Sequence, residues 1–271
     1  MADAALHQDG ALTTETVLIT GASTGIGAEL ARLFAKDGAR LVLVARDREK
    51  LAQLAQRLES ESRAQVLVIS QDLAGIDGVD ALMVELRDAP IDVLVNNAGV
   101  GVYGPFAATD LAAERRMIQL NVAALTELTK RCLPGMLERR RGRILNVAST
   151  AAFQPGPLMA VYYATKAYVL SFSEALANEL SGSGITVTAL CPGPTLTEFQ
   201  RRAGTGRLRL FGFGIMDAAV VARAGYDGLR RGRRIVIPGL VNRLAVSLVR
   251  VTPRRLVTAV VRALQERREG G

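Results

Sequence analysis

Short apolar runs rich in β-branched residues alternate with longer amphipathic segments, and this alternation restricts the fold more than any other feature. Several runs, such as LVLV at 41–44 and VLVI at 66–69, are apolar throughout, as in strands covered on both faces. We expect strands at 16–20, 40–45, 65–70, 92–96, 143–147, 185–190 and 234–238, and helices near 25–36, 47–61, 77–88, 110–138, 161–181 and 217–231. This order predicts an α/β fold, a doubly wound (Rossmann) parallel sheet of about seven strands with helices on both faces.

Composition excludes several classes of protein. No apolar run reaches the ~20 residues that a membrane span needs. We expect the polar start, Met1–Thr14, to be a disordered tail and not a signal peptide. Two cysteines, Cys132 and Cys191, are too few for a disulfide framework or a metal cluster, which indicates a reducing, cytoplasmic location. The single histidine, His7, lies in the tail, so histidine-based hydrolysis and histidine-ligated zinc are not expected.

The first expected strand leads into the glycine-rich turn TGASTGIG, residues 20–27, and then into a helix. Glycines allow the backbone to approach a pyrophosphate, and the helix N-terminus offers free N–H groups and a positive dipole end to that anion. The spacing is GxxxGxG rather than the commoner GxGxxG, and an ordinary βα turn is the alternative. Its position after the first strand favours a dinucleotide site.

The residue after the second strand bears on the choice of cofactor. An aspartate there would bind the adenosine ribose 2′-hydroxyl, whereas an arginine accommodates a 2′-phosphate. Arg46 occupies this position, followed by Arg48, so we expect NADP(H). The alternative is that Arg46 is only a solvated charge near a helix start.

A tyrosine and a lysine four residues apart, Tyr162 and Lys166, lie on one face of an expected helix. A nearby ammonium lowers the pKa of a phenol, so this pair predicts an acid/base tyrosine. Tyr163 points about 100° away and lacks that partner. Ser149 ends the fifth strand, at the sheet edge where ligands bind in open α/β folds.

Together with NNAG at 96–99 and PGPTLT at 192–197, these motifs resemble the short-chain dehydrogenase/reductase family in its short, single-domain form, over about residues 15–240. The resemblance implies that Tyr162 exchanges a proton with the substrate oxygen while Ser149 orients the carbonyl or alcohol. Lys166 would hold the nicotinamide ribose and lower the pKa of the tyrosine, and Asn121 would keep a water in the proton relay. No metal is required.

The resemblance also implies the binding residues. Those expected to contact NADP(H) are Gly21, Ser23, Thr24, Gly25, Ile26, Gly27, Arg46, Asp72, Leu73, Asn97, Ala98, Gly99, Tyr162, Lys166, Pro192, Gly193, Thr195 and Thr197. Those expected to contact substrate are Ser149, Phe153, Tyr162 and Phe199. The surrounding loops carry further apolar residues, namely Val102, Tyr103, Phe106, Leu158, Leu208, Leu210, Phe211 and Phe213. They suit a lipophilic ketone or aldehyde, or alternatively pack a lid or a subunit interface.

The last part of the chain is basic. Residues 201–271 contain 16 arginines and four acidic residues, which predicts an anionic partner. Within it, residues 241–271 read as an amphipathic helical extension of the 15–240 NADP-binding and catalytic domain. Asn242, Arg243, Ser247 and Arg250 form a narrow polar stripe, and Thr252-Pro253 starts a second helix. The wide apolar face of this extension could pack on the same domain or another subunit, or lie on an anionic membrane.

The leading hypothesis is therefore an NADP(H)-dependent carbonyl reductase or alcohol dehydrogenase acting on a small, lipophilic molecule. A nucleotide-bound sensor without turnover is one alternative, and a sugar-nucleotide epimerase or dehydratase, which shares YxxxK, is another. The resemblance implies a homodimer or homotetramer. Nucleic-acid binding is not expected, because the basic stretch lacks interleaved aromatic residues.

Overall fold

The computed structural model describes residues 15–62, 64–87, 89–203 and 215–266, and it confirms the predicted doubly wound α/β fold. Seven parallel strands form one sheet in the order β3-β2-β1-β4-β5-β6-β7. They are β1 Thr16–Thr20, β2 Arg40–Ala45, β3 Val66–Ser70, β4 Val93–Asn96, β5 Gly142–Val147, β6 Ile185–Leu190 and β7 Ile235–Val236. The strand order reverses between β1 and β4, and ligands bind outside such a switch point in folds of this kind.

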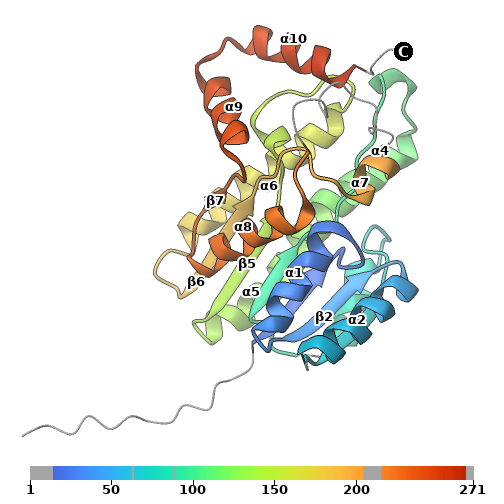
Figure 1. The fold of residues 1–271 in the computed structure, drawn as a ribbon, viewed down its shortest axis with the longest axis vertical. Coiled ribbons are helices and arrows are strands. Elements are labelled where there is room, and N and C mark those ends of the chain that lie inside the picture. The colour runs from blue at the N-terminus through green and yellow to red at the C-terminus, as the bar shows by residue number, and fades with distance from the viewer. Residues whose placement is uncertain (1–14, 63, 88, 204–214, 267–271) are drawn as a thin grey trace, which may run out of the picture.

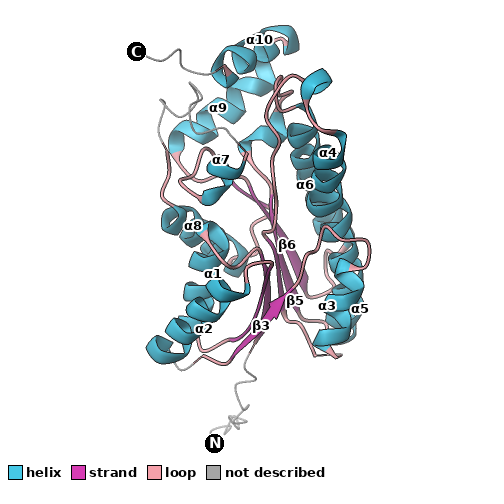
Figure 2. Cartoon of the chain, turned by 90° about the vertical axis from the view of Figure 1, so that its right-hand side faces the viewer, coloured by secondary structure: helices cyan, strands magenta, loops and turns pink. Residues whose placement is uncertain are grey.

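Helices cover both faces of the sheet. Helices α1, α2 and α8 lie on one face and α3, α5 and α6 on the other (Figures 1 and 2). The α-helices are α1 Gly25–Lys36, α2 Arg48–Ser62, α3 Gly78–Leu86, α4 Leu111–Ile118, α5 Leu125–Glu138, α6 Ala160–Glu179, α7 Glu198–Arg202, α8 Ala218–Arg230, α9 Leu240–Val251 and α10 Arg254–Gln265. Among the described residues, none of the helices is both long and apolar enough to cross a membrane.

The expected helix at 110–138 is interrupted. A π-helical segment, η2 (Gln119–Ala124), separates α4 from α5, with Asn121 in its centre. A π-turn holds one extra residue, and the apolar spacing on either side does not reveal it. Three smaller differences separate the observed elements from those expected from the sequence. Helix α7 was not expected, β7 is shorter than 234–238, and α10 begins at Arg254, after Pro253.

The core divides into two layers because alternate residues of each strand point to opposite faces. Val17 and Ile19 of β1 pack with Phe34 of α1 on one face, whereas Leu18 packs with Leu128 of α5 on the other. All five residues of β1 are buried. This double covering explains the uninterrupted apolar runs of the central strands.

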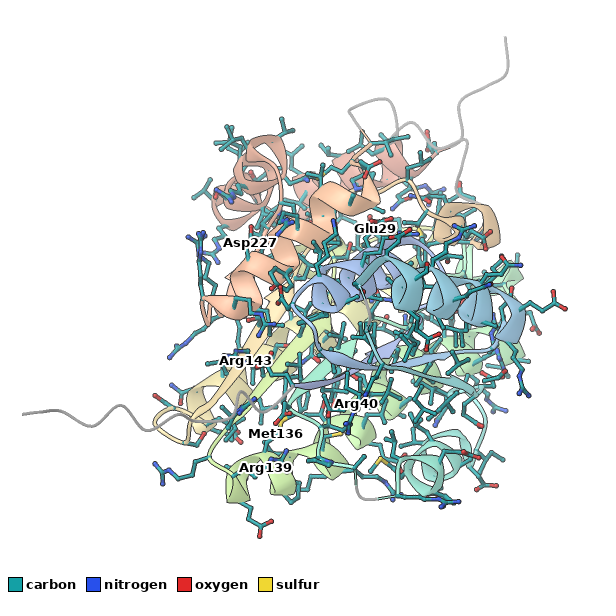
Figure 3. The ribbon with its side chains drawn as sticks, turned by 60° about the horizontal axis from the view of Figure 1, so that its bottom comes forward. Glu29, Arg40, Met136, Arg139, Arg143 and Asp227 are labelled. Atoms are coloured by element: carbon teal, nitrogen blue, oxygen red, sulfur yellow. The ribbon has the colours of Figure 1, made fainter. Side chains whose placement is uncertain are left out.

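An ion-pair cluster ties the amino end of the sheet to α8. Glu15, just before β1, pairs with Arg143 of β5 and with Arg230 of α8, and Arg230 also pairs with Asp37. Figure 3 views this end and labels Arg143. Burial would raise the pKa of Glu15, but the hydrogen bonds and charges of Arg230 and Arg143 lower it overall. The cluster fixes α8 at the end of the sheet opposite to the strands' carboxyl ends.

A buried polar network joins the two central strands to the helices that carry the site. Asn96 Nδ2 of β4 donates to Asn146 Oδ1 of β5 at 2.9 Å and to Thr129 Oγ1 of α5 at 3.0 Å. Asn146 Nδ2 in turn donates to Ser173 Oγ of α6 at 2.9 Å. Asn146 is fully buried, so removing its amide leaves buried polar groups without partners.

We therefore expect Asn146→Ala to lower the free energy of unfolding by about 2–3 kcal/mol, measured by urea denaturation. The matched control is Asn178→Ala on the same helix as Ser173, where the side chain is exposed. That control should stay within about 0.5 kcal/mol of the wild type. Equal effects of the two variants would contradict a structural role for the network.

Candidate functional site

The glycine-rich turn after β1 packs directly on the turn after β4. Thr20 Oγ1 accepts hydrogen bonds from the backbone N–H groups of Asn97 and Ala98, both at 3.0 Å. Gly21 has φ +63°, and a Cβ there would lie 2.9 Å from Ala98 Cα. Only glycine fits both constraints. The close approach brings the carboxyl ends of β1 and β4 together at the switch point.

The N-terminus of α1 opens toward this junction. Its N-cap, Thr24, makes no side-chain capping bond, so the side chain does not satisfy the first backbone N–H groups of the helix. Such a terminus favours an anion through both its donors and its dipole. Gly27, also expected at the cofactor, does not line the cavity beside the turn. A Cβ there would lie 2.5 Å from both Gly21 O and Asn97 Nδ2, so Gly27 serves close packing.

A cavity of about 590 Å³ lies along the carboxyl ends of the strands, between this turn and α6. Its size suits an extended dinucleotide together with part of a substrate. The lining includes every residue expected at the cofactor except Gly27. These are Gly21, Ser23, Thr24, Gly25, Ile26, Arg46, Asp72, Leu73, Asn97, Ala98, Gly99, Tyr162, Lys166, Pro192, Gly193, Thr195 and Thr197.

Two charged residues mark the end of the cavity near β2 and β3. Arg46 is exposed immediately after β2, where it can reach a phosphate group. Asp72 pairs with Arg116 and accepts a hydrogen bond from Ala74 N at 3.1 Å. Burial would raise the pKa of Asp72, but these bonds and the charges of Arg116 and Arg46 lower it overall. Asp72 is therefore a fixed hydrogen-bond acceptor at neutral pH.

The other end of the cavity brings Ser149, Tyr162 and Lys166 together. Lys166 Nζ donates to Val147 O, at the end of β5, at 2.8 Å and lies 5.9 Å from the centroid of the Tyr162 ring. Ser149 Oγ accepts from Ala151 N at 3.1 Å, donates to Pro192 O at 3.4 Å and lines the same cavity as Tyr162. The helix and the strand end thus present a phenol, a hydroxyl and an ammonium in one cavity.

The pKa of Tyr162 is shifted upward, whereas the sequence predicted a downward shift. Burial raises it, the hydrogen bond with Ser149 lowers it only in part, and the neighbouring Tyr163 adds to the rise. Burial lowers the pKa of Lys166 to about 8, with Cys191 opposing that shift. The pKa of Tyr162 is therefore shifted opposite to the predicted lowering, with burial as the largest cause and no contribution from Lys166. Tyr162 is a neutral phenol at neutral pH.

Asn121 lies behind the cavity rather than in its lining. Its Oδ1 accepts from Val100 N at 3.0 Å, and its Nδ2 donates to Val100 O at 2.9 Å and to Thr165 Oγ1 at 3.1 Å. The π-turn aims this side chain at the loop after β4. A Cβ on Gly99 would contact both Asn121 Oδ1 and Lys166 Nζ, so the two side chains converge at Gly99.

The residues expected at the substrate divide into two groups. Phe199 of α7 lines the cavity with its ring 5.3 Å from that of Tyr162. Phe153 packs beside Val169 and Ala148 and lines a separate depression, so its contact with substrate stays a prediction. The other loop residues vary. Val102 and Leu158 are partly buried, Tyr103 packs against α10, Phe106 is 68% exposed, and Leu208, Leu210, Phe211 and Phe213 lie outside the described residues.

The sequence reasoning missed Gln265, the last residue of α10. It is 1% exposed, lines the cavity and donates through Nε2 to Tyr163 Oη, and its backbone carbonyl accepts from Tyr103 Oη at 2.8 Å. Its Oε1 has no hydrogen-bond partner within the described structure. The signal was the spacing of Val257, Val261 and Gln265, which places all three on one face of the helix.

Comparisons with known proteins agree with this geometry. The family model for short chain dehydrogenase matches residues 15–207. Ketoacyl reductase HetN of Nostoc sp. is 39% identical over 184 residues, which span 67% of this chain and 64% of that protein. The chain therefore covers less than two thirds of that relative.

Two solved structures are similar over most of the chain. A short-chain dehydrogenase from Sphingobium yanoikuyae in complex with NADPH is 40% identical with a TM-score of 0.80, covering 88% of this chain and 94% of that one. A bulky-bulky ketone specific alcohol dehydrogenase from Comamonas testosteroni is 33% identical with a TM-score of 0.74, covering 89% and 95%.

The buried ammonium predicts a specific pH dependence of stability. Below pH 8, Lys166 is charged in both the folded and the unfolded state, and the cost of burying it is fully present. Between pH 8 and 10.5 the unfolded chain binds this proton and the folded chain does not, so stability rises with pH. Relative to Lys166→Met, the free energy of unfolding of the wild type should rise by about 3 kcal/mol across this range. A pH-independent difference in urea denaturation would contradict the assignment.

Proposed function

Because the chain belongs to the short-chain dehydrogenase/reductase family and is therefore an oxidoreductase, we propose that it reduces lipophilic ketones or aldehydes with NADPH. The observation that carries the proposal is the meeting of Tyr162, Ser149 and Lys166 at one end of a cavity whose other end is the glycine-rich turn. A sensor without turnover has no need for this arrangement.

The cavity fits a nicotinamide dinucleotide. The uncapped N-terminus of α1 and the close-packed Gly21 offer a site for the pyrophosphate, and Asp72 and Arg46 lie where the adenosine half would bind. Lys166 and Tyr162 would contact the nicotinamide half. The bound nicotinamide supplies or accepts a hydride at its C4 position.

The chain's own residues supply the proton and the orientation. Tyr162, a neutral phenol at neutral pH, would donate its proton to the substrate oxygen as that oxygen gains negative charge. Ser149 would hold the same oxygen by a hydrogen bond, and the Lys166 ammonium would hold the nicotinamide ribose beside it. Asn121, tied to Val100 and Thr165, would keep the loop after β4 in place and support the proton relay. A protonated tyrosine fits the direction of carbonyl reduction.

The substrate end of the cavity is apolar. Phe199 and Met159 line it beside Tyr162, and Gln265 adds a single polar group. The names of two similar proteins point to the same chemistry, one a ketoacyl reductase and the other specific for bulky ketones. We propose a carbonyl flanked by hydrophobic groups, with Gln265 Oε1 accepting a hydrogen bond from the substrate.

Assembly and location stay predictions. Exposed apolar residues on α4, α5 and α6, namely Ile118, Leu137 and Tyr168, offer surface for the expected homodimer or homotetramer. Both cysteines, Cys132 and Cys191, are buried free thiols, in keeping with a reducing cytoplasmic compartment.

Replacing the phenol tests the mechanism. We expect Tyr162→Phe to lower kcat for NADPH-dependent ketone reduction by about 10²–10⁴-fold while NADPH binding changes little, because only the proton donor is lost. Turnover is followed by NADPH absorbance and binding by its fluorescence. Tyr168→Phe, on the same helix but outside the cavity, is the matched control and should retain its activity. Near-normal turnover of Tyr162→Phe would refute the mechanism.

Replacing Arg46 tests the choice of cofactor. Arg46→Asp removes the cation that would pair with the 2′-phosphate and adds a carboxylate that can bind a ribose 2′-hydroxyl. The ratio of kcat/KM for NADPH to that for NADH should fall by about 100-fold or more. Arg48→Asp makes the same charge change two residues away, outside the cavity lining. If both variants shift the ratio equally, Arg46 does not read the phosphate.

A further inference from the structure

Helix α9 turns its apolar side outward. Only Val246 of this helix is buried, whereas its large apolar residues are 61–80% exposed: Leu240, Val241, Leu244, Leu248 and Val251. At about 100° per residue, these five occupy one arc of roughly 100°. Two residues of the polar stripe bond to the chain's own backbone, since Asn242 Nδ2 donates to Pro238 O at 2.8 Å and Arg243 Nε to Ile237 O at 2.9 Å.

Helix α10 has two apolar faces. Val257 and Val261 pack with Tyr163 and Met159 against the site, while Leu256 and Val260, about 100° around the helix, are 55% and 50% exposed. Arg255 and Arg262, both exposed, lie between these faces. Both helices lie at the same end of the molecule (Figures 1 and 2). We refer to the seven exposed apolar residues of α9 and α10 as the outer apolar surface.

The arginines around the outer apolar surface favour a negatively charged partner. Residues 240–266 contain five arginines and one acidic residue, Glu266, which pairs with Arg262 at 3.7 Å. Apolar side chains flanked by arginines, whose long stems let the guanidinium groups reach a headgroup layer, are typical of helices lying in an anionic membrane interface. A second copy fits less well, because a two-fold contact would set one arginine-rich surface against another.

We propose that α9 and α10 dock this protein on anionic phospholipid membranes, with the outer apolar surface among the acyl chains and the arginines at the headgroups. The docking does not depend on the identity of the substrate. The apolar arc of α9 supplies the hydrophobic contact, and Arg250, Arg255 and Arg262 supply the preference for negative charge.

The test is co-sedimentation of the full chain with vesicles of phosphatidylcholine alone or with about 30% phosphatidylglycerol. We expect at least about tenfold stronger partition onto the anionic vesicles, weakened by salt at about 0.5 M. Leu244→Glu/Leu248→Glu should reduce that partition by about tenfold or more, since two charges would enter the apolar layer. Arg255→Gln/Arg262→Gln should remove much of the anionic preference and leave the fold intact.

The matched control is Ile76→Glu/Val84→Glu, which adds the same charges at apolar residues 94% and 74% exposed elsewhere on the molecule. It should bind vesicles like the wild type. None of these substitutions changes a residue that lines the cavity. Ketone reduction at the wild-type rate therefore shows that a variant is folded. Equal binding to both vesicle types, or unchanged binding of both the glutamate and the glutamine variants, overturns the proposal. A different result would also overturn it: the wild type binds no vesicles but is a dimer by light scattering, and Leu244→Glu/Leu248→Glu converts that dimer to monomers.

Discussion

The buried ammonium of Lys166 is the interaction on which the site depends. A cation enclosed in protein is costly unless its protons are taken up, and Val147 O at the end of β5 accepts one of them at 2.8 Å. This bond joins α6 to the sheet at the point where Ser149 follows. Since Tyr162 is one turn earlier on the same helix, the position of the phenol is set by where the lysine is held. The same burial that lowers the lysine pKa to about 8 raises the tyrosine pKa, so both groups keep a proton at neutral pH.

The fold could be predicted because its signals are local and repeated. Continuous apolar runs such as LVLV belong to strands covered on both faces, and the sheet order follows from parallel βαβ units. Sequence spacing also brought Tyr162 and Lys166 to one helical face, and the glycine-rich turn to the cavity. These features depend on periodicity and on residues whose backbone needs are specific, such as Gly21.

The rest depends on which side chains meet in space, and sequence spacing does not contain that information. The π-turn at Asn121 adds one residue without disturbing the apolar pattern on either side. The direction of the Tyr162 pKa shift was misjudged because its largest cause is the burial of the phenol, which the spacing of Tyr162 and Lys166 does not reveal. Phe153 and Phe199 looked equivalent in the sequence, yet only Phe199 reaches the cavity.

The rotation of helix α10 about its axis determines which of its apolar residues face the site and which are exposed on the outer side. Val257, Val261 and Gln265 repeat every fourth residue and face the site, and Leu256 and Val260 precede the first two by one residue and face away. A rotation of the helix by about 100° would turn Leu256 and Val260 toward Tyr163 and put Leu264 in the place of Gln265. The bonds from Gln265 to Tyr163 and from Tyr103 to Gln265 oppose that rotation. The contacts that complete the cavity therefore also determine which apolar residues the molecule presents on its outer side.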